Sequence, residues 1–434
     1  MIRRREERDE IEEEQRKEAE AENAGEIGAM TAEAAGSETA EGASLEELDT
    51  EAIKAKKKNE KALLKAMHKQ EKEARQKAFS ARWQGGGTQG KTVAGVISLT
   101  LIMLLTACIS VFHVGDVETE VSFVTGFIGK ICYIAGSIGI PMLFILLGFE
   151  LLNRDFSSRE RIADYYKKVF LPAFIIWEIG VAFYQVFFFL FYGRQFNIGT
   201  WVKEAFLIKY VDLGHTWTAR FFMLLFLFAP VVAKVLQAFS ASSLRLILII
   251  LWVFLFMFPG FDLYGQANSG VSSFPFYSGT VCYFFYFCVG HMISRYSQRI
   301  LKGSSEVVLF LLSLALTIFS QFFLEIKGVD YLVKPTYFSV SIMAIMGFDL
   351  LIRVKIDEMF PKMASFFETA FAGLAGVYLI FRPIQLLIER YLIFGKIVNG
   401  VDNLGAMIAG TILSWLLACA VSYGVMVAVK KVRK

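Results

Sequence analysis

The segment at positions 93–114, VAGVISLTLIMLLTACISVFHV, contains no Lys, Arg, Asp or Glu over its whole length. An α-helix needs about 20 consecutive, mostly apolar residues to cross the hydrocarbon core of a bilayer. A shorter apolar segment would fit the core of a soluble protein, but this one is long enough to span. It therefore predicts a transmembrane helix.

Nine later stretches have the same character, and several of them contain a proline, which packed membrane helices tolerate. They lie at 130–152, 169–192, 217–237, 243–261, 278–297, 305–325, 335–353, 365–389 and 405–429. Hydrophobic residues make up 55% of the chain, more than the roughly 45–50% of an average soluble protein. We predict an all-α, polytopic membrane protein in which residues 91–434 form about ten transmembrane helices surrounded by lipid.

Residues 1–90 form a charged tail of different composition. Residues 1–50 carry 6 Lys/Arg and 17 Asp/Glu, whereas residues 51–91 carry 12 and 4. The acidic part has too few apolar residues to offset the entropy of ordering, so we expect disorder there. For the basic part we expect a helix, and two interpretations stay open: it lies on anionic lipid headgroups, or it is a solvated helix that merely keeps the tail cytosolic. As partners of the tail we expect anionic lipid or an unknown cytosolic protein.

The distribution of Lys and Arg between the loops predicts the orientation, because cytoplasmic loops carry the excess of both. The loop at 153–168 and the end of the chain are basic, whereas the loop at 115–122 has neither residue. We therefore expect a multi-pass protein of the cell membrane with both termini in the cytoplasm. Acidic residues follow Arg5 where a signal peptide would have an apolar stretch, so none is expected.

Two other classes of partner are not expected. The formal net charge of +4 is too small to indicate nucleic acid. All five cysteines lie inside apolar segments, and none has metal-ligand spacing to a histidine. The sequence thus predicts no disulfide framework and no metal.

Polar side chains within the apolar segments are the candidate functional residues, because an ionisable group at a helix centre costs about 2.5–3.5 kcal/mol on insertion scales. Toward the outer half these are His113, Glu178, Gln185, His215, Trp217, Arg220, Tyr378 and Arg382. Toward the inner side they are Glu150, Arg245, His291, Arg295, Asp349 and Arg353. Glu178 and Gln185 are expected on one helix face, as are Tyr378 and Arg382.

Structural explanations for the same residues stay open. Glu178 can pair with Arg220 or Arg382 to hold the bundle together, and His113 can be an interfacial histidine. The inner group can extend its charged ends to the cytosolic interface.

Five segments in the right order resemble motifs of the acyltransferase 3 family. The stretch 137–153, SIGIPMLFILLGFELLN, is similar to the second-helix motif. The stretch 165–177 resembles the basic segment and proline-bearing helix that follow it. The others are 215–217 (HTW), 285–290 (FYFCVG) and 376–383 (GVYLIFRP). The resemblance covers about residues 93–429.

The resemblance implies a membrane-bound O-acyltransferase. Such proteins move an acyl group, usually acetyl from cytosolic acetyl-CoA, to a hydroxyl of an envelope polysaccharide or a lipid-linked sugar. The family's helix-1 histidine corresponds to His113, which would take the hydroxyl proton as general base. Arg220 or Arg382 would stabilise charge on the acyl carbonyl oxygen, with Glu178 as a further catalytic candidate.

The remaining candidates fall into two sets by expected role. Substrate binding is assigned to His215, Trp217, Tyr378 and Gln185. Arg245, Arg295 and Arg353 are assigned to the phosphates of the acyl donor.

Two alternatives stay open. The family carries Arg or Lys eleven positions before its helix-1 histidine, and this chain has Ile102 there. A non-catalytic relative that binds or exports a glycan or lipid-linked substrate would fit that difference. An unrelated transporter or sensor, with the charged tail as its working part, is the other.

Overall fold

The computed structural model describes residues 61, 63–64, 87–112, 123–195, 197–208, 216–269, 279–295, 301, 303–327, 334–354, 361–388, 390–391 and 401–432. The chain separates into two units, Met1–Lys77 and Ala78–Lys434. In the first unit, Lys61, Leu63 and Leu64 are helical and exposed. Apart from residues 87–90, which begin the helix Gly87–Phe112, the rest of the tail predicted at 1–90 lies outside the described residues. The disorder and the basic helix expected there stay predictions.

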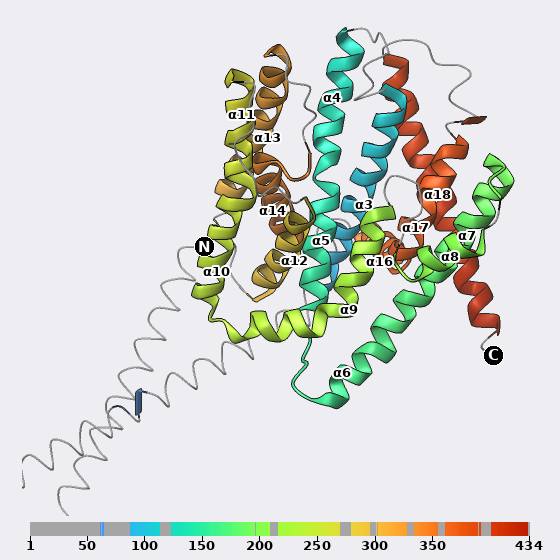
Figure 1. Ribbon diagram of the computed structural model, residues 1–434, viewed down its shortest axis with the longest axis horizontal. Helices are drawn as coiled ribbons and strands as arrows, with labels where there is room; N and C mark the ends of the chain where they lie inside the picture. The colour runs from blue at the N-terminus through green and yellow to red at the C-terminus, as the bar shows by residue number, and fades with distance from the viewer. Residues whose placement is uncertain are drawn as a thin grey trace, which may run out of the picture. The chain divides into compact units, whose positions relative to one another are not determined.

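In the described part of the second unit every regular element is a helix (Figure 1). The first half contains α3 (Gly87–Phe112), α4 (Phe123–Ser137), α5 (Gly139–Leu151), α6 (Arg159–Tyr165), the π-helical turn η1 (Tyr166–Phe170), α7 (Leu171–Tyr192), α8 (Ile198–Ala205) and α9 (Thr216–Ala238). The second half contains α10 (Ala241–Trp252), the π-helical turn η2 (Val253–Met257), α11 (Phe258–Ser269), α12 (Gly279–Arg295), α13 (Gly303–Ile326), α14 (Phe338–Ile352), α16 (Pro361–Ala372), α17 (Leu374–Ile388) and α18 (Val401–Val432).

The all-α, multi-pass prediction is confirmed in its main point. Within the described residues seven helices are long and apolar enough to cross a membrane, and α16 with α17 makes an eighth if that bent pair is one span. The two other predicted segments are also helical, but α12 has 17 residues and α14 has 15. Both fall short of the roughly 20 residues of a spanning helix, so the count of ten stays a prediction.

Two stretches that lie between predicted transmembrane segments contain helices. The basic loop expected at 153–168 becomes helical at Arg159, because the Ser158 side chain accepts a hydrogen bond from the Arg161 amide at 3.3 Å and caps the helix. Lys168 and Asp164, four residues apart, add an ion pair at 2.6 Å. Beyond Gly193 the short helix α8 appears, capped by Asn197.

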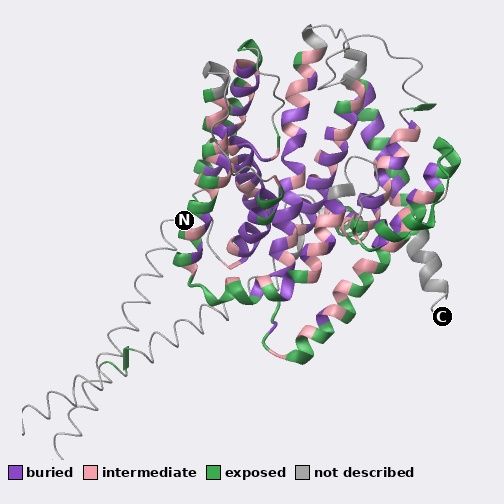
Figure 2. Cartoon of the chain, viewed as in Figure 1, coloured by how far each residue is buried: buried purple, intermediate pink, exposed green. Residues whose placement is uncertain are grey.

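The centre of the bundle is the crossing of α5 with α12. A Cβ added at Gly148 would collide with the carbonyl group of Phe287, and one at Gly290 with the carbonyl oxygen of Ile145. Only glycine permits so close an approach of two backbones. Buried residues are concentrated along α5, α12 and α14, whereas α6 to α8 keep many exposed residues (Figure 2).

The segment predicted as one helix at 365–389 is broken. The axes of α16 and α17 differ by 79°, and the first turn of α17 is joined to Gly373, whose carbonyl oxygen accepts the Val377 amide at 2.9 Å. Hydrogen bonds then fix α17 to its neighbours: Tyr184 of α7 donates to the carbonyl oxygen of Leu379, and Thr218 of α9 shares a hydrogen bond with Tyr378. The helix α17 therefore joins α7 and α9 at one place.

Candidate functional site

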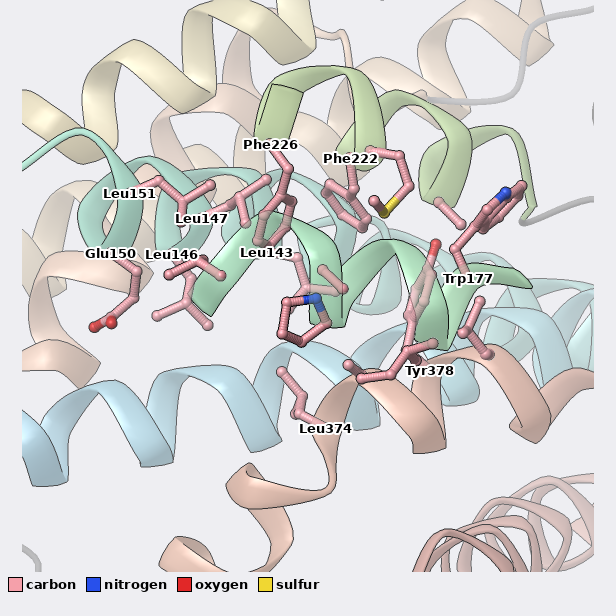
Figure 3. Close-up of a pocket in the computed structure, with 18 of the residues that line it drawn as sticks. Leu143, Leu146, Leu147, Glu150, Leu151, Trp177, Phe222, Phe226, Leu374 and Tyr378 are labelled. Atoms are coloured by element: carbon pink, nitrogen blue, oxygen red, sulfur yellow. The ribbon is translucent and has the colours of Figure 1, made fainter. Parts of the chain in front are cut away.

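A cavity of about 510 Å³ lies between α5, α7, α9 and the bent pair α16–α17 (Figure 3). Its middle is walled by apolar side chains, among them Leu143, Leu147, Phe222 and Phe226. Polar side chains lie toward its ends: Glu150 at one, and Tyr378 near the other. The cavity thus has a charged end, an apolar middle and a hydroxyl group beyond it.

The charged end is formed where α5 ends and α7 approaches. The Arg154 and Lys168 side chains line it beside Glu150. Glu150 forms an ion pair with Lys91 at 3.1 Å, and Lys168 pairs with Asp164 at 2.6 Å. The Lys168 side chain keeps 69% of its surface exposed, so a charged ligand in water can reach this end.

Tyr378, predicted to bind substrate, lines the other end of the cavity and is buried. Its hydroxyl shares a hydrogen bond with Thr218, and its ring packs edge-on against Phe222 at 5.7 Å between centroids. Because Thr218 belongs to α9 and Tyr378 to α17, this pair connects two of the walls.

Arg382 lies one helical turn beyond Tyr378 on α17 and belongs to a polar cluster with α3. Its guanidinium donates to Gln385 Oε1 at 2.9 Å and to Ser110 Oγ at 3.2 Å. Gln385, fully buried, also accepts from Thr106 Oγ1 at 2.7 Å and donates to the Met103 carbonyl oxygen at 3.1 Å. Arg382 is thereby held in one orientation at the end of α3.

The predicted general base follows this cluster along the chain. His113 is three positions after Ser110 and lies outside the described residues, as does His215. The backbone of Trp217 lies in the first turn of α9, but its side chain is outside the described set. These three assignments stay predictions.

The other outer residues gather at a different place. Arg220 donates to the carbonyl oxygen of Ile208, just after α8, at 3.4 Å. Gln185 of α7 donates to Glu204 of α8, whose side chain is buried. The outer group therefore divides into an α17–α3 cluster and a set of contacts around α8.

Glu178 does not join either group among the described residues. Its Oε1 atom is buried and has no hydrogen-bond partner there, and the cavity lining does not include it. The described ion pairs likewise join it to neither arginine. Within the described part of the chain its carboxyl group has no contact that indicates a role.

The three arginines assigned to donor phosphates do not line the cavity. Arg245 is exposed on α10, and Arg295 donates to the carbonyl oxygens of Leu236 and Phe239 at the end of α9, at 3.5 and 2.8 Å. Arg353 pairs with buried Asp349 at 2.7 Å.

The cations that do line the cavity are Arg154 and Lys168. Both lie in the basic loop predicted at 153–168, from which the sequence analysis predicted only the orientation of the chain in the membrane. Their positive charge could therefore have been considered from the sequence as a phosphate-binding feature. In the described ranges no three His, Cys, Asp or Glu side chains gather as metal ligands would.

Comparison with protein families gives a match over most of the chain. Residues 96–430, most of the chain, match the model of an acyltransferase domain, that of the acyltransferase 3 family. No curated protein and no solved structure gives a significant match.

Proposed function

Because the chain belongs to the acyltransferase 3 family, we propose that it transfers an acyl group from acyl-CoA to a hydroxyl group of an envelope polysaccharide or a lipid-linked sugar. One observation carries the proposal beyond the family. The cavity leads from exposed cations to Tyr378, one turn from Arg382, whose guanidinium contacts Ser110 near the end of α3. In the sequence His113 follows Ser110 by three positions. That is the order in which a donor with a charged head and a reactive far end needs its contacts.

The donor enters with its phosphates at the charged end, on the cytoplasmic side. Arg154 and Lys168 bind the phosphates through charge-assisted hydrogen bonds. The cavity lining on α9 extends from Ala219 to Phe226, about 10 Å along a helix. The narrow pantetheine arm fits such a passage and carries its thioester, with acetyl as the acyl group, to the end at Tyr378.

The chemistry joins the acyl carbon to the acceptor oxygen. His113 takes the proton from the acceptor hydroxyl while its oxygen attacks the thioester carbonyl, and the C–S bond breaks as the ester C–O bond forms. Arg382 stabilises the negative charge that develops on the carbonyl oxygen. The proton then passes from His113 to the departing thiolate, which leaves as free CoA.

One feature favours the non-catalytic alternative. Ile102, at the position where the family carries a basic residue, is almost completely buried in α3. Apolar packing fills that place, with the Ile102 side chain close to Gly139 of α5. A relative that binds and moves a glycan without acylating it would not need the missing cation.

The test is transfer of label from radioactive acetyl-CoA to the envelope fraction of the source cells by the purified full-length protein in lipid nanodiscs. We expect a labelled glycan or lipid-linked sugar with the unchanged protein and none with His113→Ala. His68→Ala, in the charged tail, is the matched control and should keep full activity. Binding of a glycan with no transfer of label would favour the non-catalytic alternative.

A further inference from the structure

We propose that Tyr165 is a positioning residue for donor binding. Its hydroxyl group holds the segment α6–η1 (Arg159–Phe170) against α9 and thereby keeps Lys168 at the charged end of the cavity. The inference rests on the proposed function, which makes the donor's phosphates the ligand of Lys168. The contact with α9 is a property of the fold and can be measured with no donor present.

The first observation is the proline inside α9. In an α-helix the carbonyl of Phe226 accepts from the amide of residue 230, and Pro230 has no N–H to donate. The Tyr165 hydroxyl donates to this same carbonyl oxygen at 2.6 Å. The next residue, Tyr166, donates to the carbonyl oxygen of Leu227 at 2.9 Å. Two consecutive tyrosines therefore bind α9 within the turn that precedes its proline.

The second observation is how little else of this segment is buried. Tyr165 is the only buried residue of α6, and η1 contains none. The Tyr165 ring also packs edge-on against Phe156, with 5.2 Å between centroids. A segment with so few buried contacts opens easily. The hydroxyl contact with the Phe226 carbonyl is therefore a large share of what holds α6–η1 in place.

The third observation is that this contact lies at the charged end of the cavity. Phe226, which supplies the acceptor, and Lys168 of η1 both line the cavity (Figure 3). Lys168 pairs at 2.6 Å with Asp164, the residue directly before Tyr165. Because these residues lie within five positions of one helical segment, the contact that fixes Tyr165 also fixes where the Lys168 side chain begins.

The other cation of the charged end is held by α9 as well. The Gln237 side chain donates to the carbonyl oxygens of Leu152 and Arg154 at 3.0 and 3.3 Å. The helix α9 thus contacts both cation-bearing segments, one before Pro230 and one after it. A site whose cations are already in place binds more tightly than one that must first be assembled.

The experiment is equilibrium titration of the full-length protein in nanodiscs with CoA and with adenosine 3′,5′-bisphosphate, which has comparable phosphates and no pantetheine arm. Tyr165→Phe removes the hydroxyl and keeps the ring. We expect about 3- to 10-fold weaker binding of both ligands, the effect of one lost hydrogen bond. In the transfer assay KM for acetyl-CoA should rise by the same factor with kcat unchanged.

Tyr286→Phe is the matched control for a purely structural effect. The Tyr286 hydroxyl also donates to a backbone carbonyl, that of Pro335 at 2.8 Å, and this tyrosine is buried but does not line the cavity. Its replacement should lower the stability about as much as Tyr165→Phe does, with no change in the affinity for either ligand.

A second pair of changes tests whether Tyr165 acts through Lys168. Lys168→Ala should itself weaken binding of both ligands, and Tyr165→Phe should add little further loss in that background, because the two changes remove one effect.

A measurement without donor tests the contact itself. Amide hydrogen exchange of residues 159–170 should be faster in Tyr165→Phe than in the unchanged protein, and unchanged in Tyr286→Phe. Pro230→Ala gives the Phe226 carbonyl an amide donor within α9, so the Tyr165 hydroxyl stabilises the contact less and the same exchange should be faster. That variant keeps the test valid if Tyr165→Phe fails to fold.

Unchanged binding of the bisphosphate by Tyr165→Phe would overturn the inference, as would full further weakening in the Lys168→Ala background or an equal loss of affinity in Tyr286→Phe. A protein that binds neither CoA nor the bisphosphate, although exchange of residues 159–170 still responds to Tyr165→Phe, would overturn the proposed function, since the contact would then hold a segment that binds no donor.

Discussion

Replacement of Arg382 by lysine separates a catalytic role of the guanidinium from a structural one. The Arg382 side chain uses two different nitrogens, Nη1 to Gln385 and Nη2 to Ser110, at 2.9 and 3.2 Å. Lysine keeps the positive charge but has one nitrogen on an unbranched stem. It cannot reproduce the planar, two-pronged contact.

The loss of stability follows from those two contacts. A hydrogen bond to a charged group contributes about 1.5–3 kcal/mol in soluble proteins, and interhelical hydrogen bonds in a membrane protein average about 0.6 kcal/mol. Because lysine retains one of the two bonds, we expect Arg382→Lys to cost about 1–2 kcal/mol. That leaves most of the protein folded.

The expected loss of activity is larger. Removal of one donor to a developing oxyanion lowers kcat by about 10²–10³-fold in well-studied enzymes. We therefore expect Arg382→Lys to reduce the rate of label transfer by about 100-fold at saturating acetyl-CoA. The rate is divided by the folded fraction, measured by gel filtration, so that stability does not enter.

Arg390→Lys is the control. Arg390 is exposed and donates to the carbonyl oxygen of Phe191 at 3.1 Å, away from the cavity. Its replacement should leave the rate within about 2-fold, since exposed contacts are weak. A rate for Arg382→Lys within about 3-fold of the unchanged protein would refute the catalytic role and leave Arg382 as a bridge between α17 and α3.

Two further predictions concern packing and donor binding. Gly148→Ala should lower the stability of the protein in detergent by about 1–3 kcal/mol, because the added methyl group would collide with the carbonyl of Phe287. Gly126→Ala is the control and should not lower it, because a methyl group added there has no neighbouring atom in contact. Equal melting temperatures of the two variants would contradict the close crossing of α5 with α12. Lys168→Glu should raise KM for acetyl-CoA by about 3- to 10-fold with kcat unchanged, more at low salt than at high salt. The same rise with Arg245→Glu would show a general charge effect and no site at the cavity.

Most of the architecture was predictable because hydropathy over 20 residues is a strong signal. Each predicted segment is helical in the structure, and the family resemblance is confirmed by the match over residues 96–430. The features that the sequence did not predict are local ones. A polar stretch such as 158–168 has no hydropathy signal, and only the Ser158 cap and the pairing of Asp164 with Lys168 reveal its helix. The bend between α16 and α17 lies at Gly373, and no proline at that position indicates a bend in the sequence.

The site was predictable only in part. The spacing of Tyr378 and Arg382 placed them correctly on one side of one helix, but their partners on α3 and α9 carry no signal. Hydroxyl side chains in membrane helices usually bond to their own backbone, as Ser98 does to the Ala94 carbonyl at 2.6 Å. Ser110 instead accepts a hydrogen bond from Arg382 on another helix. Only the packing of α3 against α17 distinguishes Ser110 from Ser98.

The choice of candidate phosphate-binding cations depends on how strongly each cation is already paired, and the sequence does not show these pairings. Arg353 is paired with Asp349, whose carboxylate is 0% exposed. Separating a buried pair costs about 3–5 kcal/mol. A phosphate that bound Arg353 would have to offset that cost before its binding became favourable. Lys168 is paired with Asp164 at the surface, where such a pair contributes only about 0.3–0.5 kcal/mol. A multiply charged phosphate group displaces the weaker partner easily. If acyl-CoA is the donor, as proposed, we expect its phosphates to bind the cation whose existing contacts are weakest, and Lys168 at the cavity meets that condition.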